Sequence, residues 1–442
     1  MPNTTRSIAD GSGRALAEPG YWAWVPTAFS ALRHRNYRLY WLGQIVSLVG
    51  TWMQRTAQGW LVTDLVLELV SGARVEGLTN WYVALVTAMG TLPVLLLGPF
   101  TGVIADYLDK RRVLIVTQTL MAAQAALLAL MAYLQILNIP WLIVLALFLG
   151  IVTAVDIPAR QGMAIELVGR EHLPNAIALN SGVFNTARVI GPAITGVMLA
   201  LHFSVADAFL LNAVSYVAVI FALVVMRGDF APRAHAGGQR RETYWSRTYA
   251  GVSFLLTARG VRRIVVMVGV LALLVTPFVA LLPAIARYRL SAGPAQFGFL
   301  ATSFGAGAVV GSLVLAYLSG RQLQYLTLRI GYVLLLGGVI VVSQLRSLPA
   351  AYITLALTGF GFNWTFADSN TILQLYVPDE LRGRVMGVYS MLFVGPYPVG
   401  TLLMGWVATN LGVSTALLAG TLISCAVALV LFVRHPRTNA TL

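Results

Sequence analysis

Residues 98–118, GPFTGVIADYLDKRRVLIVTQ, place five charged side chains between two long apolar runs. The charged residues are Asp106, Asp109, Lys110, Arg111 and Arg112. In a soluble protein such a cluster would be an ordinary solvated loop. Its meaning here depends on the solvent for which the rest of the chain is built.

The composition predicts an all-α integral membrane protein. Of 442 residues, 58% are hydrophobic and 10% are charged, with a mean hydropathy of +0.78. A soluble protein carries roughly 25% charged residues. Several apolar runs reach the ~20 residues that a helix needs to cross the ~30 Å hydrocarbon core. These runs do not alternate in polarity as the strands of a membrane β-barrel do.

We predict twelve transmembrane helices in two halves of six. The longest polar segment between spans, 227–261, forms a central loop that separates a first half, 39–226, from a second, 262–433. The flanking segments are 1–38 and 434–442. The expected spans are 39–62, 78–105, 111–136, 140–160, 174–202, 205–226, 264–286, 294–318, 326–345, 349–370, 385–408 and 411–433.

The basic residues predict the orientation. If both termini are cytoplasmic, 24 basic residues lie in cytoplasmic segments and four in outer ones. This bias satisfies the positive-inside rule. The net charge of +14 is therefore explained by topology, and no nucleic-acid partner is expected. Residues 1–38 lack a short apolar core, so we expect no cleavable signal peptide. The single cysteine, Cys425, excludes an intramolecular disulfide.

A weak repeat relates the two halves. Shifting the chain by 209 residues superposes five glycines of the first half on glycines of the second. Two parallel six-helix halves, with a substrate site between them at the membrane midplane, are a transporter architecture. We therefore expect two pseudo-repeats. The pairs are Gly98 with Gly307, Gly102 with Gly311, Gly150 with Gly359, Gly191 with Gly400, Gly196 with Gly405 and, among acidic residues, Glu171 with Glu380.

The opening cluster resembles the signature of the loop between the second and third helices of the major facilitator superfamily, Gly-x-x-x-Asp-(Arg/Lys)-x-Gly-(Arg/Lys)-(Arg/Lys). Gly102, Asp106 and Lys110 match the signature, as does Arg111 or Arg112. Tyr107 replaces a basic residue, and Asp109 replaces a glycine. These two departures concern the geometry of the turn.

Three further stretches resemble one branch of that superfamily. They are LRHRNYRLYWLGQIVSLVGTWMQRTAQGWLV (32–62), DIPARQGMAIELVGREHLPNAIALNSGVFNTARVIGPAITG (156–196) and VPDELRGRVMGVYSM (377–391). The branch contains the enterobactin exporter and macrolide efflux proteins, and the resemblance covers about 32–433. It implies a multi-pass exporter of the bacterial cytoplasmic membrane that works as a monomer without a cofactor.

The same resemblance implies a conformational latch. A carboxylate such as Asp106 can accept hydrogen bonds from free N–H groups at the start of a neighbouring helix. In the family that neighbour is the eleventh span, which begins here near 380–387. We expect the latch to hold in the outward-facing state, and a purely topological charge run is the alternative. The latch residues are Gly102, Asp106, Lys110, Arg111, Arg112, Glu380 and Arg382.

The fifth span carries GVFNTARVIGPAITG (182–196), which resembles a motif of antiporters. Small residues let helix backbones approach closely. Pro192 removes one backbone hydrogen bond and favours a bend. We predict a sliding interface at Gly182, Gly191, Pro192 and Gly196, and a static, tightly packed helix is the alternative.

Two arginines are expected inside the membrane, where ionisable groups are costly and usually functional. Arg55 lies roughly 25 Å, and Arg188 roughly 21 Å, from the cytoplasmic ends of their helices. No carboxylate falls at the midplane of the first or seventh span, so a neutral or anionic substrate is favoured. The predicted substrate-binding residues are Arg55, Arg188, Gln54, Gln58, Asn185, Trp52 and Trp364.

Two carboxylates are candidates for proton coupling. Asp156 in the fourth span is preferred, and Asp368 in the tenth is the second choice. The alternative role for Asp156 is an ion pair with Arg160, four residues on along the helix.

The sequence thus predicts a secondary active exporter of an amphipathic metabolite such as a siderophore, driven by proton antiport. A polyspecific drug efflux pump and an uptake permease remain open alternatives. An enzyme is disfavoured, since neither a His-Glu-x-x-His metal motif nor a Gly-x-x-x-x-Gly-Lys phosphate loop occurs.

Overall fold

The computed structural model describes residues 27–72, 74–227, 253, 258–318, 321 and 323–433. Within helices it leaves undescribed the side chains of 27, 28, 99, 102–107, 170, 259, 379, 380, 382–384, 432 and 433. Every named element in the described part is helical, which confirms the predicted all-α class.

The first half begins with a short 3₁₀ helix and continues with five α-helices. The fourth of these, α4, contains two of the predicted spans and turns sharply at Gly169, whose φ of 71° suits a residue without a Cβ. The elements are η1 (Thr27–Arg33), α1 (Arg35–Leu69), α2 (Val75–Tyr107), α3 (Lys110–Tyr133), α4 (Ile139–Ala200) and α5 (Val205–Val225).

The second half contains interrupted helices at two of its predicted spans. The seventh span is divided at Pro277 between α7 and α8, and the eleventh is divided at Gly395 between α12 and α13. The elements are α7 (Arg259–Leu274), α8 (Phe278–Ala284), the π-helical η2 (Ile285–Arg289), α9 (Pro294–Leu318), α10 (Gln324–Gln344), α11 (Leu348–Tyr376), α12 (Asp379–Val394), α13 (Pro396–Leu411) and α14 (Val413–Val433).

Short polar residues fix several helix starts. Asp109, which departs from the family signature, precedes α3 and accepts a hydrogen bond from the backbone N–H of Arg112 at 3.2 Å. Asn138 caps α4 in the same way, and Ser204 forms a capping box with Asp207 at α5. Such side chains satisfy N–H groups that a helix start leaves free. The tight turns between spans therefore follow from local sequence.

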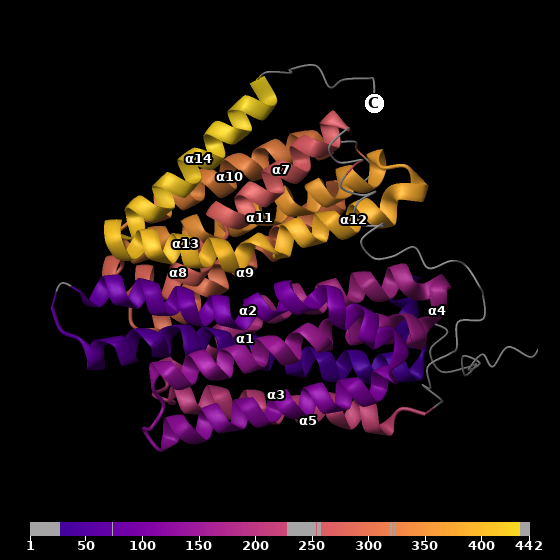
Figure 1. The fold of residues 1–442 in the computed structure, drawn as a ribbon, viewed down its shortest axis with the longest axis horizontal. Coiled ribbons are helices and arrows are strands. Elements are labelled where there is room, and N and C mark those ends of the chain that lie inside the picture. The colour runs from indigo at the N-terminus through magenta and orange to yellow at the C-terminus, as the bar shows by residue number, and fades with distance from the viewer. Residues whose placement is uncertain are drawn as a thin grey trace, which may run out of the picture.

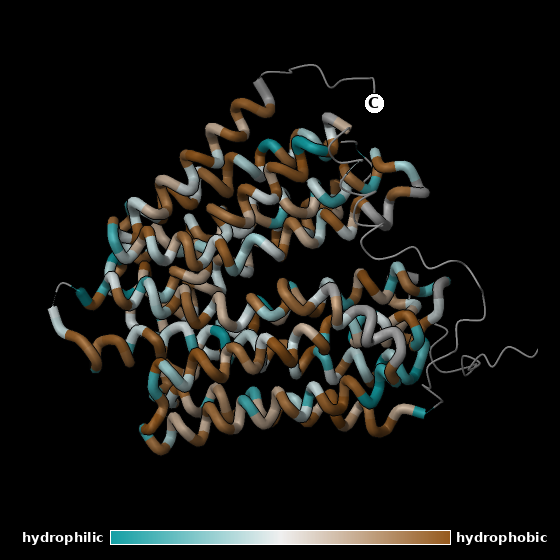
Figure 2. Tube along the Cα trace, in the orientation of Figure 1, coloured by the Kyte–Doolittle hydropathy of each residue, from teal (hydrophilic) through white to brown (hydrophobic). Residues whose placement is uncertain are grey.

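Ten stretches in the described residues are long and apolar enough to cross a membrane. Two predicted spans, α1 and α11, are not among the ten, although their 35 and 29 residues exceed the ~20 required. Both carry several buried polar side chains, including Gln44 and Gln54 in α1 and Asp368 in α11. Large hydrophobic side chains such as Phe221 and Leu313 are exposed, and apolar residues extend along most helices (Figure 2).

The helices form two groups, α1–α5 and α7–α14, which lie one above the other in Figure 1. Their packing follows the same order in each: α3 contacts α4 and α5, as α10 contacts α11 and α14. Likewise α2 packs on α4, as α9 packs on α11. This shared order supports the predicted pseudo-repeats.

The glycines matched by the 209-residue shift strengthen that relation. Gly191 lies against α1 at Trp52, and its match Gly400 lies against α7 at Leu273. Gly150 of α4 packs on α2, as its match Gly359 of α11 packs on α9. The pair Gly98 and Gly307 differs, since a Cβ at 98 would meet nothing within 4 Å whereas one at 307 would meet Ala356.

Candidate functional site

The two halves meet along two helix pairs, α4 with α9 and α2 with α13. At the first pair the backbones touch, because a Cβ on Gly298 would lie 2.5 Å from the Cα of Gly196. At the second pair, Thr409 donates a hydrogen bond to the Gly77 carbonyl at 2.9 Å. Small residues thus allow close helix contact at the interface between the halves.

The face where α1 ends and α2 begins is closed by polar and aromatic contacts between the halves. Asp64 of α1 forms a 2.6 Å ion pair with Arg287, whose guanidinium also lies 4.6 Å from the Trp60 ring centroid. The hydroxyl groups of Thr79 and Tyr288 are 2.9 Å apart. We call these residues the far gate.

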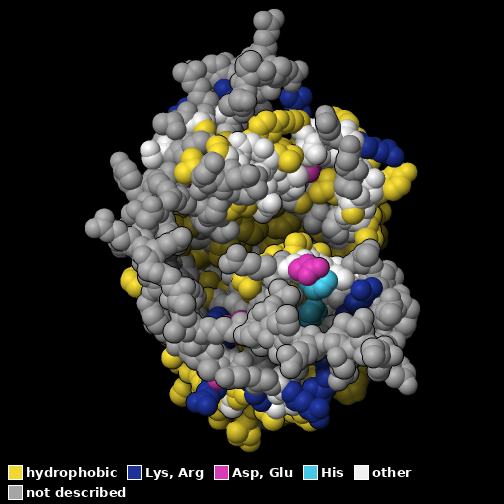
Figure 3. Space-filling model, turned by 90° about the vertical axis from the view of Figure 1, so that its right-hand side faces the viewer, with side chains coloured by type: hydrophobic (Ala, Val, Ile, Leu, Met, Phe, Trp, Pro, Cys, Tyr) yellow, Lys and Arg dark blue, Asp and Glu magenta, His cyan; other side chains and the backbone are white. Residues whose placement is uncertain are grey.

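The opposite face, where α1 begins, is open between the halves. Figure 3 looks onto this face and shows a hollow between the upper and lower halves, with hydrophobic side chains visible inside it. Basic side chains lie on both halves of this face, and an acidic and a histidine side chain border the hollow. A molecule can therefore reach the interface between the halves from this side, while the far gate blocks the other.

Arg55 and Arg188 are both without an anionic partner in the described structure. Arg55 is exposed, and its guanidinium lies 5.3 Å from the ring centroid of Trp52. Arg188 lies 5.6 Å from the ring centroids of both Phe304 and Phe362, which belong to the other half. Its Nε is buried and makes no hydrogen bond. Aromatic faces attract such cations but do not neutralise them.

Other predicted substrate ligands have different surroundings. The Gln54 carboxamide is buried, accepting a hydrogen bond from Asn212 at 2.7 Å and donating one to Gln124 at 3.2 Å. The indole of Trp364 donates to the Gly311 carbonyl at 2.8 Å. Asn185 donates to the Ser181 carbonyl, one turn earlier in α4. Gln58 is buried in α1. These polar groups, apart from Gln58, already have protein partners.

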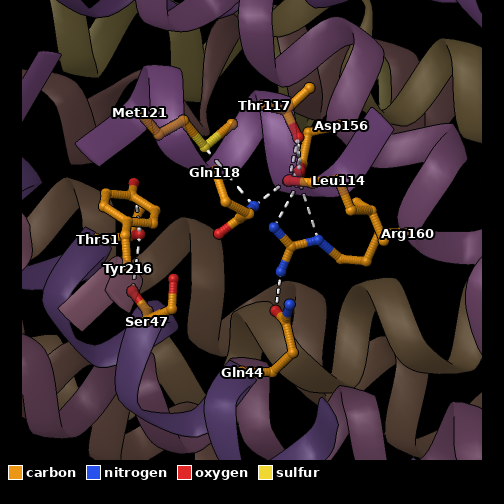
Figure 4. A network of polar contacts seen from close by, with 10 residues as sticks. All are labelled: Gln44, Ser47, Thr51, Leu114, Thr117, Gln118, Met121, Asp156, Arg160 and Tyr216. Atoms are coloured by element: carbon orange, nitrogen blue, oxygen red, sulfur yellow. Dashed lines mark hydrogen bonds and ion pairs between the residues drawn. The ribbon is translucent and has the colours of Figure 1, made fainter. Parts of the chain in front are cut away.

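Asp156 lies in a buried polar network (Figure 4). Its carboxylate accepts hydrogen bonds from Thr117 at 2.8 Å and Gln118 at 2.7 Å and forms a 2.5 Å ion pair with Arg160. Arg160 also donates to Gln44 of α1. The ion pair expected as the alternative role of Asp156 is therefore present.

Asp368 has fewer contacts. Its side chain is 1% exposed, and its Oδ2 atom has no hydrogen-bond partner. A buried carboxylate oxygen without a partner is costly when the group is charged, and less so when it is protonated.

The opening charge cluster contacts its own half where it is described. Lys110 forms a 2.6 Å ion pair with Glu166 of α4. Arg111 donates to the carbonyls of Leu223 and Val224 at the end of α5. Arg112 lies 3.3 Å from Asp109. The side chains of Gly102, Asp106, Glu380 and Arg382 lie outside the described part, so the latch stays a prediction.

The predicted small-residue motif divides into two parts. Gly191 and Gly196 pack closely on α1 and α9, and the Pro192 carbonyl lies beside Gly298. A Cβ added to Gly182 would meet no other atom within 4 Å. Gly182 instead borders a cavity of about 380 Å³ between α1 and α4. The sequence analysis missed this cavity, whose walls include Trp41, Ile45, Val49, Gly182, Val183 and Thr186.

Comparison with known families gives a match over nearly the whole chain. Residues 26–441 match the family described as transmembrane secretion effector. The multidrug efflux pump Tap of Mycolicibacterium fortuitum is 27% identical, over 83% of this chain and 93% of its own length. The staphyloferrin A transporter of Staphylococcus aureus is 26% identical, over 83% of this chain and 87% of its own length. Macrolide efflux protein A of Streptococcus pyogenes is 24% identical, over 89% of this chain and 95% of its own length.

Solved structures share the fold at low sequence identity. A bacterial homologue of the human lysosomal transporter Spinster, in an inward-facing and unoccupied conformation, superposes with a TM-score of 0.67 at 10% identity, covering 90% of this chain and 96% of that one. The nucleoside transporter NupG gives a TM-score of 0.65 at 12% identity, covering 89% and 98%.

Proposed function

Because the chain belongs to the transmembrane secretion effector family of the major facilitator superfamily, we propose that it exports an anionic or neutral amphipathic metabolite, such as a siderophore. The observation that carries this proposal is the pair of arginines, Arg55 and Arg188, which have no anionic partner among the described residues. An unpaired charge at membrane depth is costly and marks a substrate path. An anionic substrate compensates both charges.

The hollow faces the cytoplasm in this proposal. Basic side chains lie on both halves of the face that carries the hollow, and the positive-inside rule places that face in the cytoplasm. The substrate then enters from the cytoplasm while the far gate is closed. Export requires the far gate to open and the hollow to close in turn.

We infer proton antiport as the energy source, with Asp368 as the coupling carboxylate in preference to Asp156. Protonating Asp156 would break its ion pair with Arg160 and leave a buried cation unpaired. Protonating Asp368 removes a charge from an oxygen that lacks a partner. Asp368 therefore tolerates repeated protonation and deprotonation better than Asp156 does.

A polyspecific drug pump is the second candidate. The relatives include a multidrug efflux pump and a macrolide efflux protein, and the hollow exposes hydrophobic side chains. Such a pump would accept neutral and cationic compounds as readily as anions. The charge of the exported compound separates the two candidates.

The test is export from an efflux-deficient bacterium, with and without a protonophore. Its panel pairs cationic dyes and macrolides with catecholate and hydroxamate siderophores. We expect protonophore-sensitive export of an anionic compound, reduced roughly 10-fold or more by Arg55→Gln or Arg188→Gln, since a charge-assisted hydrogen bond contributes about 1.5–3 kcal/mol. Arg346→Gln, an exposed position away from the hollow, is the matched control. Export of cationic dyes alone would overturn the proposal.

A further inference from the structure

The cavity between α1 and α4 has the character of a binding pocket for an apolar group. Its volume of about 380 Å³ falls in the ~300–1,000 Å³ range of ligand sites. Aliphatic and aromatic side chains make up most of its wall, including Ile45, Val49 and Val183. The indole N–H of Trp41 is directed at the Leu179 carbonyl, 3.5 Å away. Thr186 alone offers a hydroxyl group among the lining residues.

A glycine keeps this pocket open. Gly182 lines the pocket, and a Cβ there would meet nothing within 4 Å. In contrast, Gly191 and Gly196 of the same helix are each pressed against a neighbouring backbone. Close helix packing therefore explains those two glycines but not Gly182. Any larger side chain at 182 would project into the space of the pocket.

Trp52 connects the pocket wall to Arg55. Along α1, Trp52 lies one turn from Val49 of the pocket wall and one turn from Arg55, although Val49 and Arg55 themselves point roughly 120° apart around the helix. Each step rises about 4.5 Å, so Arg55 lies roughly 9 Å from Val49 along the helix axis. The Trp52 ring contacts Phe184 of α4 edge-on, at 5.7 Å between centroids, and the Arg55 guanidinium lies 5.3 Å from the centroid of the same ring.

Charge and shape together select one class of occupant. An apolar body fills the pocket, and an anionic group about 9 Å away meets Arg55. A cationic amphiphile would place like charges together, and a neutral one would leave the arginine charge unpaired. We propose that the pocket between α1 and α4 is the apolar subsite for an amphipathic carboxylate that enters from the hollow. This inference rests on the proposed function and specifies the substrate that it requires.

The test measures binding to the full chain in nanodiscs of zwitterionic lipid, using straight-chain carboxylates from hexanoate to dodecanoate. We expect affinity to rise roughly fourfold per methylene until the pocket is full, since burying one methylene contributes about 0.8 kcal/mol. Gly182→Leu should weaken dodecanoate binding at least 10-fold and leave hexanoate within about twofold, because its side chain occupies the pocket. Gly337→Leu in α10, where a Cβ also meets nothing within 4 Å, should bind like the unaltered chain.

A separate measurement tests whether Arg55 binds the anionic head group of the carboxylate. Arg55→Gln should weaken all the carboxylates by a similar factor and remove the preference over alcohols of the same length. Equal binding of alkyltrimethylammonium ions, or unchanged dodecanoate binding by a folded Gly182→Leu variant, would overturn the inference. Folding of each variant is checked by its thermal unfolding midpoint, and Gly182→Ala supplies a milder change if leucine unfolds the chain.

Three further outcomes are informative, and the last two separate this inference from the proposed function. If nanodiscs with added anionic phospholipid displace the carboxylates in a Gly182-dependent way, the pocket binds membrane lipid and the inference fails. If anions are exported from cells with equal efficiency by Gly182→Leu, the inference fails while the proposed function stands. If carboxylates bind as expected but no anion is exported, the pocket stands and the proposed function fails.

Discussion

The Asp64 carboxylate of α1 lies 2.6 Å from the Arg287 guanidinium, so an ion pair joins the two halves at the face where α1 ends. The side chains are 37% and 21% exposed, and pairs of this kind contribute about 1 kcal/mol or less. The pair is thus strong enough to bias the far gate toward the closed state and weak enough to break during transport.

Arg287→Gln should therefore open the far gate more often. We expect up to about a fivefold gain in the labelling rate of a thiol at Thr79→Cys by a membrane-impermeant reagent, from about 1 kcal/mol of lost pairing. Cys425→Ala removes the native thiol from the background. Arg346→Gln should not change the labelling rate, and an unchanged rate in Arg287→Gln would show that the pair does not control the gate.

A disulfide across the same face should stop transport. A Cβ on Gly77 would lie 3.0 Å from the Thr409 carbonyl oxygen and 3.7 Å from the Thr409 Cγ2 atom, so cysteines at these two positions bring their thiols close together across α2 and α13. In the Cys425→Ala background, Gly77→Cys with Thr409→Cys should lose export on oxidation and recover it on reduction. Each single cysteine variant is the control. Full export by the oxidised pair would mean that these helices do not separate during the cycle.

The contact between Gly196 and Gly298 predicts a sharp size limit at the interface of the halves. A Cβ on Gly298 would lie 2.5 Å from backbone atoms that cannot move away independently. Gly298→Ala should lower the thermal unfolding midpoint and reduce export. Gly337→Ala should be neutral or stabilising by up to about 1 kcal/mol, because alanine is the better helix former and its Cβ meets nothing. Equal unfolding midpoints and equal export for Gly298→Ala and Gly337→Ala would contradict this prediction.

Much of the fold was predictable because lipid imposes strong rules on sequence. Apolar runs located the helices, as in α9, where the expected 294–318 agrees with Pro294–Leu318. The 209-residue shift also matched glycines that make equivalent contacts, such as Gly191 and Gly400. These signals depend on length, polarity and residue size, all of which a sequence displays directly.

The site was less predictable, because the sequence gives the depth of a residue along a helix but not the direction in which its side chain points. Gln54 was expected to line the cavity but is buried against Asn212, and Trp364 is turned toward Gly311. Both helices carry polar side chains that are buried inside the protein, so polarity alone does not show which side of the helix meets the substrate. The open space beside Gly182 was hidden for the same reason, since packed and unpacked glycines look alike in sequence.

The different surroundings of Asp156 and Asp368 predict opposite effects of the same substitution. Asp368→Asn should fold normally and lose the dependence of export on the proton gradient. Asp156→Asn should unfold more easily, by about 3 kcal/mol or more, because Arg160 loses its buried partner. Export with and without a protonophore and thermal unfolding midpoints measure the two effects. A stable, uncoupled Asp156→Asn variant would reverse the assignment.

A histidine pair between the start of α1 and α4 predicts a pH effect on local structure. His34, at the start of α1, and His172 of α4 have ring centroids 5.1 Å apart. Hydrogen bonds flank the pair: Asn175 accepts from the Ala31 N–H at 2.9 Å, and Tyr37 donates to the Ala176 carbonyl at 2.9 Å. The start of α1 is thus attached to α4 through this contact.

Burial and, to a smaller extent, His172 lower the pKa of His34, while nearby Glu171 raises it. A lowered pKa means that the separated state binds the proton more readily than the packed state. The contact is therefore fully stable above the ordinary histidine pKa of about 6.5 and weakens as the pH falls below it.

Hydrogen exchange of a peptide covering residues 27–41 measures this effect. After correction for intrinsic exchange rates, protection should fall between about pH 7.5 and pH 5.5, as His34 takes up a proton. His34→Gln should remove the pH dependence, because glutamine keeps the polarity of the side chain but does not titrate. His202→Gln, at the opposite end of α4, should leave the dependence intact. A pH dependence that persists in His34→Gln would assign the effect to another group.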